Sequence, residues 1–117
     1  MKKLLLLVLV AALVSCDGGG ITLPTGCDAN VNWSPPTERL GGAPLSVEEL
    51  EKFTIYVSKT GDTDQKELER VLDVNDTYLI SWRVENLGQG THWFYMTATD
   101  TEGNVSGYSN ILSMTCT

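Results

Sequence analysis

Short runs in which apolar and polar residues alternate recur along this 117-residue chain and limit its fold more than any other feature. Alternation with a period of two places every second side chain on one face, which is typical of a strand with one buried face. Turn-forming Asn, Asp, Gly and Pro residues separate the runs. Six such runs predict an all-β fold, an antiparallel β-sandwich. The residues expected to face inward are Ala29, Val31 and Trp33; Phe53, Ile55 and Val57; Tyr78, Ile80, Trp82 and Val84; Phe94, Met96 and Ala98; and Leu112, Met114 and Cys116.

Two segments fit the alternation less simply. Residues 67–74 have mixed polarity and could form a helical turn, but a strand before Asn75 and Asp76 fits better. Residues 46–49 read Ser-Val-Glu-Glu, which has the spacing of a capping box, with Ser46 as the cap and Glu49 reaching back. We therefore predict one short helical turn near residues 46–51.

The N-terminus has the anatomy of a secretory signal. Lys2 and Lys3 precede an apolar run over residues 4–14, which is too short for a membrane-spanning helix of about 20 residues. The run ends in Leu13-Val14-Ser15-Cys16, which resembles the lipobox of bacterial lipoproteins, in which the cysteine is acylated and becomes the mature N-terminus. An ordinary cleaved signal followed by a chance cysteine is the alternative interpretation.

The lipobox resemblance divides the chain into three parts. Residues 1–15 would be the lipoprotein signal peptide, and residues 16–26 a flexible tether anchored at Cys16, with glycines at 18–20 as a spacer. Residues 27–117 would be one folded domain. The protein is then expected in the cell envelope, held outside the cytoplasm on its periplasmic or surface face by a lipid in the membrane.

The charge of the mature chain narrows the choice of partners. Without the signal, six basic residues stand against fifteen acidic ones, a net charge of −9. Nucleic acid binding needs clustered Lys and Arg, so nucleic acid is not expected as a partner. Electrostatic docking on an anionic membrane is likewise disfavoured, so the lipid would have to hold the protein there.

Lipidation of Cys16 would leave Cys27 and Cys116, an even pair in an oxidising compartment. A disulfide between them would close nearly the whole domain. Two free thiols are the alternative.

Three segments together resemble a bacterial fibronectin type III domain over residues 27–117. Residues 31–37 (VNWSPPT) resemble the second strand of that family, with its core tryptophan. Residues 42–45 (GAPL), followed by residues 53–57, resemble the entry into the third strand. Residues 87–110, from LGQGT to YSN, resemble the last hairpin. The expected fold is therefore an immunoglobulin-like sandwich of fibronectin type III type, with a first strand that is short or missing.

This resemblance has two consequences for named residues. It implies that Cys27 and Cys116 meet at one pole of the sandwich, and strand parity points both inward. The family places a tyrosine at the start of its sixth strand, whose hydroxyl ties down a nearby loop, but His92 stands there in this chain. The corner bond is therefore either absent or made by an imidazole.

Residues that could carry out chemistry are scarce. His92 is the only histidine, expected on or near the core face in a structural role, and no inward carboxylate pair is seen, so we expect no enzyme. Zinc would need more His and Cys ligands than the chain offers, and no cofactor is expected. The acidic stretches 62–64 and 100–104 suggest either calcium or ordinary turns, and turn chemistry is the favoured interpretation.

An aromatic surface is the best candidate site. If Phe53, Ile55 and Val57 face inward, Tyr56 faces outward, and the same parity turns Trp93 and Tyr95 outward. The family places these two strands side by side, so the three rings should share one exposed face. Such a face could bind a protein partner in an envelope or surface assembly, or a cell-wall or environmental glycan as a carbohydrate-binding module. Alternatively, the rings only stabilise the sheet as cross-strand pairs.

Overall fold

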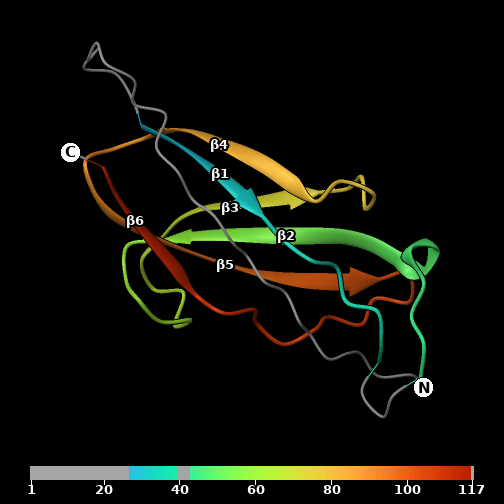
Figure 1. The fold of residues 1–117 in the computed structure, drawn as a ribbon. Helices are drawn as coiled ribbons and strands as arrows, with labels where there is room; N and C mark the ends of the chain where they lie inside the picture. The colour runs from blue at the N-terminus through green and yellow to red at the C-terminus, as the bar shows by residue number, and fades with distance from the viewer. Residues whose placement is uncertain (1–26, 40–42, 117) are drawn as a thin grey trace.

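The computed structural model describes residues 27–39 and 43–116, and these residues form two antiparallel sheets that pack as a sandwich (Figure 1). The strands are β1 (Cys27–Asn32), β2 (Leu50–Ser58), β3 (Leu68–Val74), β4 (Ser81–Leu87), β5 (Gly90–Asp100) and β6 (Leu112–Cys116). The predicted signal peptide (residues 1–15), Cys16 and the predicted tether (residues 16–26) lie outside the described residues. Within the described ranges, no helix is both long and apolar enough to cross a membrane.

The two sheets differ in size. One holds β1 and β4, and the other holds four strands in the order β3-β2-β5-β6. Every pair of neighbouring strands is antiparallel. The predicted all-β antiparallel sandwich is thus confirmed, and so is the strand interpretation of residues 67–74, most of which form β3.

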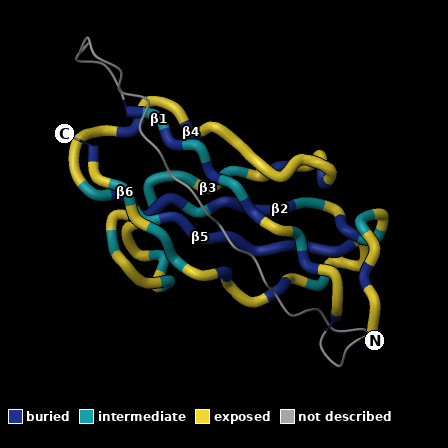
Figure 2. The backbone as a smooth tube through the Cα atoms, viewed as in Figure 1, coloured by how far each residue is buried: buried dark blue, intermediate teal, exposed yellow. Residues whose placement is uncertain are grey.

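The core lies between the sheets, where the buried stretch of β1 faces those of the neighbouring strands β2 and β5 (Figure 2). Phe53, Ile55 and Val57 on β2 are fully buried, as the alternation predicts. Trp33, just beyond β1, packs its ring 5.6 Å from the ring of Phe53. These contacts hold the small sheet against the large one. The other predicted core residues that are buried are Phe94, Met96 and Ala98 on β5, Ala29 and Val31 on β1, Val84 on β4 and Cys116 on β6. Leu112 and Met114 on β6 are partly buried against this core.

The prediction of inward-facing residues was wrong for the run that includes Tyr78 and Ile80. Strand β4 begins only at Ser81, so residues 75–80 form a connecting loop in which alternation assigns no face. Tyr78 and Ile80 are 68% and 56% exposed. Trp82 lies in register with the buried Val31, yet it is 39% exposed because it stands near the start of the strand.

The predicted helical turn is present as a single 3-10 turn, η1 (Val47–Glu49). The Glu49 carboxylate accepts a hydrogen bond of 3.0 Å from the backbone N–H of Ser46, the reaching-back half of the predicted capping box. The chain then passes directly into β2, which limits the turn to three residues.

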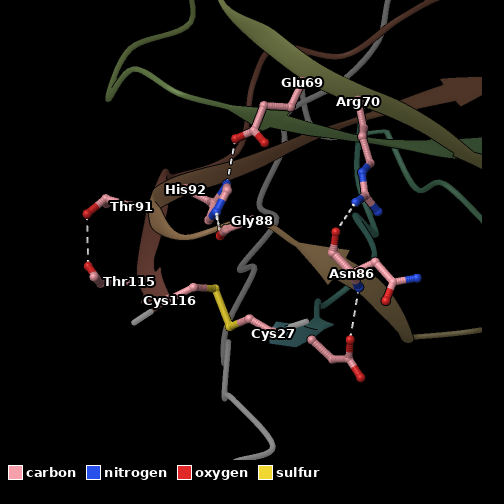
Figure 3. The surroundings of a disulfide bond; sticks show 10 residues. Cys27, Glu69, Arg70, Asn86, Gly88, Thr91, His92, Thr115 and Cys116 are labelled. Carbon is pink, nitrogen blue, oxygen red and sulfur yellow. Dashed lines mark hydrogen bonds and ion pairs between the residues drawn. A yellow bond between two sulfur atoms is a disulfide. The ribbon is translucent and has the colours of Figure 1, made fainter. Parts of the chain in front are cut away.

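A disulfide joins Cys27 to Cys116, with 5.9 Å between their Cα atoms, so the predicted pairing is confirmed (Figure 3). The bond ties the start of β1 to the end of β6 and therefore connects the two sheets covalently at one pole. Arg70 of β3 adds a second link at this pole. Its guanidinium donates to the carbonyl oxygens of Glu85 and Asn86 on β4, at 2.6 and 2.7 Å.

His92 lies beside the disulfide on the core face, as expected, and is almost completely buried (Figure 3). Its Nε2 donates to the carbonyl oxygen of Gly88, four residues earlier, at 2.6 Å. Its Nδ1 lies 2.5 Å from the carboxylate of Glu69 on β3. The imidazole therefore ties down the loop between β4 and β5, the task that the resemblance assigns to a tyrosine.

We predict that replacing both Cys27 and Cys116 with serine lowers the free energy of unfolding by about 2–5 kcal/mol. The physical reason is that the unfolded chain loses a cross-link that spans 89 residues. Urea unfolding followed by tryptophan fluorescence measures the change. Reductant should lower the stability of the natural chain to that of the double variant and leave the variant unchanged. Equal stability of the natural chain with and without reductant would contradict the prediction.

Candidate functional site

Strands β2 and β5 bring the three predicted aromatic residues onto the outer face of the four-stranded sheet. Tyr56 pairs with Tyr95, and Ser58 pairs with Trp93, so all three side chains share the face opposite the core. The rings of Tyr56 and Tyr95 stack with centroids 5.1 Å apart and planes 18° apart. The prediction of one shared face is confirmed.

The prediction that all three rings are exposed was wrong for Tyr95, which is fully buried. Tyr56 and Trp93 are half-buried. Tyr108 stands edge-on to Tyr95, with centroids 5.2 Å apart, and covers it from the side. Burial raises the pKa of the Tyr95 hydroxyl. Tyr95 is therefore the base of the aromatic face rather than part of its surface.

The connection between β2 and β3 also covers this face. The side-chain amide of Gln65 donates to the Tyr108 hydroxyl at 3.0 Å. Gly61 lies against the Trp93 indole so closely that an added Cβ would stand 3.0 Å from its Nε1. A side chain at position 61 would therefore have to displace the indole by a few tenths of an ångström. Strand parity cannot foresee a loop that folds back over a sheet.

Tyr108 also belongs to this face, and strand parity does not predict it. It precedes β6 in a segment that belongs to no strand. That segment is nevertheless fixed on the edge of β5 by two serines. The Oγ atoms of Ser106 and Ser109 accept hydrogen bonds of 2.8 Å from the backbone N–H groups of Ala98 and Met96. The side chains thus replace part of a strand ladder and aim Tyr108 at the sheet. No sequence period signals this arrangement.

A strip of four side chains results, which we call the aromatic strip: Val71, Tyr56, Tyr95 and Tyr108. Val71 pairs with Tyr56 and is 53% exposed, and Tyr108 is 45% exposed. The stacked and edge-on rings fix the geometry of the strip from below. Such a surface offers flat apolar contact area with hydroxyl groups at its margin, which suits the binding of a protein surface or a sugar ring.

The aspartates of the acidic stretches 62–64 and 100–104 accept hydrogen bonds from groups within their own turns. Asp62 Oδ1 accepts hydrogen bonds from the Thr60 hydroxyl and the Asp64 N–H, at 3.0 and 3.1 Å. Asp100 Oδ1 accepts from the N–H groups of Glu102 and Asn104, at 2.9 and 2.8 Å. These bonds support the interpretation as turn chemistry. In residues 27–39 and 43–116, no three His, Cys, Asp or Glu side chains gather as a metal site would require.

Asp100 is fully buried and forms an ion pair with Arg39, at 2.9 Å. Burial alone would raise the pKa of its carboxyl group. Hydrogen bonds from Asn104, Arg39 and Glu102 outweigh that effect and lower the pKa from 3.8 to about 2. The fold therefore stabilises the ionised carboxylate of Asp100, which lies at the pole opposite the disulfide.

We predict that Asp100 makes the fold acid-sensitive. Because its pKa is lower in the folded chain, its contribution of about 2 kcal/mol is complete above pH 4 and declines as the pH falls toward 2. Urea unfolding from pH 5 to pH 2 measures the decline. Asp100→Asn should be less stable at neutral pH and lose less stability between pH 4 and pH 2. Parallel pH profiles for the two chains would contradict the assignment.

Comparison with known proteins establishes the class of fold. Sixteen chains of solved structures match this one. One of them is described as "Computer-Based Redesign of a beta Sandwich Protein Suggests that Extensive Negative Design Is Not Required for De Novo beta Sheet Design". It is 20% identical, with a TM-score of 0.50, over 95% of this chain and 88% of its own. The similarity shows a β-sandwich fold. No family model and no curated protein matches the chain.

Proposed function

We propose that this protein is a non-enzymatic, lipid-anchored module outside the cytoplasm that binds a protein partner and serves an envelope or surface assembly. The aromatic strip is the observation that carries the proposal. Two of its members, Val71 and Tyr108, expose about half of their surface on a base that the stacked Tyr56 and Tyr95 rings hold in place. Rigid aromatic side chains lose little conformational entropy on binding, which favours affinity.

The fibronectin type III identity and the anchor are parts of this proposal. Two arrangements support the first, since the resemblance implies them both: β2 pairs with β5, and Cys27 reaches Cys116. The sequence Leu13-Val14-Ser15-Cys16 supports the lipid anchor. A disulfide is typical of proteins that fold in an oxidising compartment, so it also supports a location outside the cytoplasm.

A carbohydrate-binding module is the second candidate. The observation in its favour is the flat stacked pair of Tyr56 and Tyr95 beside the Tyr108 hydroxyl, because sugar rings pack their apolar faces on aromatic rings. Glycan arrays and pull-downs with the protein as bait distinguish the two candidates. Saturable glycan binding without a protein partner would favour this second candidate.

We predict that Tyr108→Ser weakens binding through the aromatic strip about tenfold or more, because Tyr108 is the most exposed ring of the cluster. Trp93→Ala should weaken it less, since Gly61 covers part of the indole. Titration of the captured partner or glycan measures both effects. Thr115→Ala, on the exposed side of β6, is the matched control. If Tyr108→Ser and Trp93→Ala both bind like the natural chain, the strip is not the binding surface.

We predict that Cys16→Ser moves the protein from the membrane fraction to the soluble fraction of bacterial cells, because lipidation at that cysteine is the proposed anchor. Fractionation followed by immunoblotting measures the distribution, and metabolic labelling with a fatty acid analogue tests acylation directly. Cys27→Ser keeps Cys16 and is the matched control, expected to stay with the membrane. Retention of Cys16→Ser in the membrane fraction would contradict the anchor.

A further inference from the structure

The connection between β2 and β3 lies on the outer face of the large sheet without any apolar anchor. Its residues, 59–67, read Lys-Thr-Gly-Asp-Thr-Asp-Gln-Lys-Glu, and none of them is buried. The backbone N–H of Lys59 donates to the carbonyl oxygen of Glu67 at 3.0 Å, so the two ends of the connection are fixed to each other. We call residues 60–66, between these ends, the cover loop. A polar segment with few buried contacts opens locally at low cost.

Hydrogen bonds inside the cover loop hold its first half together. The Asp62 carboxylate accepts from the Thr60 hydroxyl and from the Asp64 N–H, at 3.0 and 3.1 Å. Because these bonds join residues of the loop to one another, they persist when the loop moves away from the sheet. The cover loop can therefore move as a unit about its fixed ends.

One hydrogen bond and one packing contact join the cover loop to the face of the sheet. The side-chain amide of Gln65 donates to the Tyr108 hydroxyl at 3.0 Å, and Gly61 packs against the Trp93 indole. Gln65 has a φ of 68°, in the left-handed region that residues other than glycine rarely adopt. The conformation that brings this amide to Tyr108 therefore carries a backbone cost, which release of the loop can relieve.

The Tyr95 hydroxyl is the group that the closed loop hides. Tyr95 is fully buried, and its hydroxyl has no hydrogen-bond partner within the described ranges. Burial raises the pKa of this hydroxyl and outweighs the opposite effect of the Gln65 amide, while the charge of Asp62 raises the pKa further. Both of these groups belong to the cover loop, so the loop closes over the hydroxyl. A buried hydroxyl without a partner is costly, and any group that reaches it regains a hydrogen bond.

We infer that the cover loop is a lid over the aromatic strip, held closed by the bond between Gln65 and Tyr108. Opening uncovers the Trp93 indole and the Tyr95 hydroxyl, which add apolar area and one hydrogen-bonding group to the binding surface. A partner that uses them must first open the lid, so its apparent affinity includes the cost of opening. The inference rests on the proposed function, because it concerns the regulation of the same surface.

Hydroxyl-radical labelling, located by tandem mass spectrometry, measures the exposure of Tyr95 without any partner. Gln65→Ala and Tyr108→Phe each remove the bond that holds the lid, and we expect each to raise the labelling of Tyr95 about threefold or more. Lys66→Ala changes the neighbouring residue of the same loop, whose side chain is 78% exposed, and is the matched control that should label like the natural chain. Trp33, in the core, should keep its low labelling in every variant.

Nile red, an uncharged dye that fluoresces in contact with apolar surface, tests whether the uncovered surface binds. Gln65→Ala should bind more dye than the natural chain, and adding Trp93→Ala should remove that gain. Thermal unfolding of each variant verifies that it folds.

Equal labelling of Tyr95 in Gln65→Ala, Tyr108→Phe and the natural chain would overturn the inference. Labelling of Tyr95 that rises only together with that of Trp33 would also overturn it, because it would report unfolding of the whole domain. A dye gain that is absent, or that survives Trp93→Ala, would show that the loop covers no binding surface.

The inference and the proposed function can fail separately. Equal labelling of Tyr95 combined with weaker partner binding by Tyr108→Ser would refute the lid and leave the proposed function intact. A lid that opens as expected, combined with unchanged partner binding by Tyr108→Ser and Trp93→Ala, would instead refute the aromatic strip as the binding surface.

Discussion

The attachment of the two-stranded sheet to the four-stranded sheet is the constraint on which the rest of this structure depends. A sheet of two strands is marginally stable in water, so β1 and β4 rely on contacts with the larger sheet. At one pole these contacts are the Cys27–Cys116 disulfide and the guanidinium of Arg70. Toward the other pole, Trp33 packs on Phe53. The apolar core lies between these contacts.

Alternation in the sequence was enough to predict the core strands because a half-buried strand needs a period of two. It predicted the correct buried face for β2 and β5. The disulfide was predicted from the pair of cysteines left after Cys16, together with the fibronectin type III resemblance, which implies that the two meet at one pole. The prediction from alternation failed where the backbone no longer pairs with a neighbouring strand. Tyr78 and Ile80 keep the same spacing as strand residues, but the Asp76 turn holds them outside the sheet. Spacing cannot distinguish a strand from a loop that happens to alternate.

The candidate site was predicted in part. Parity put Tyr56, Trp93 and Tyr95 on one face, since it depends only on strand direction and register. The exposure of a side chain depends on what covers the face. Here the cover comes from connecting segments, whose sequences have no periodicity. Gly61 covers Trp93, and Tyr108, aimed by the serines before and after it, covers Tyr95. The most exposed ring was consequently missed, and the most buried one was counted as surface.

The disulfide also has a mechanical consequence for a tethered domain. Tension that enters at Cys27 divides there between the backbone and the disulfide to Cys116, because residues 27–116 form a covalently closed ring. A force applied at the loop between β3 and β4 would pull against two arms of the chain in parallel, one through β3, β2 and β1 and one through β4, β5 and β6. Opening one arm would not lengthen the molecule while the other stayed folded. If the domain is anchored through its N-terminal segment as proposed, the closed ring would let it carry force without one arm of the chain being pulled out of the sandwich.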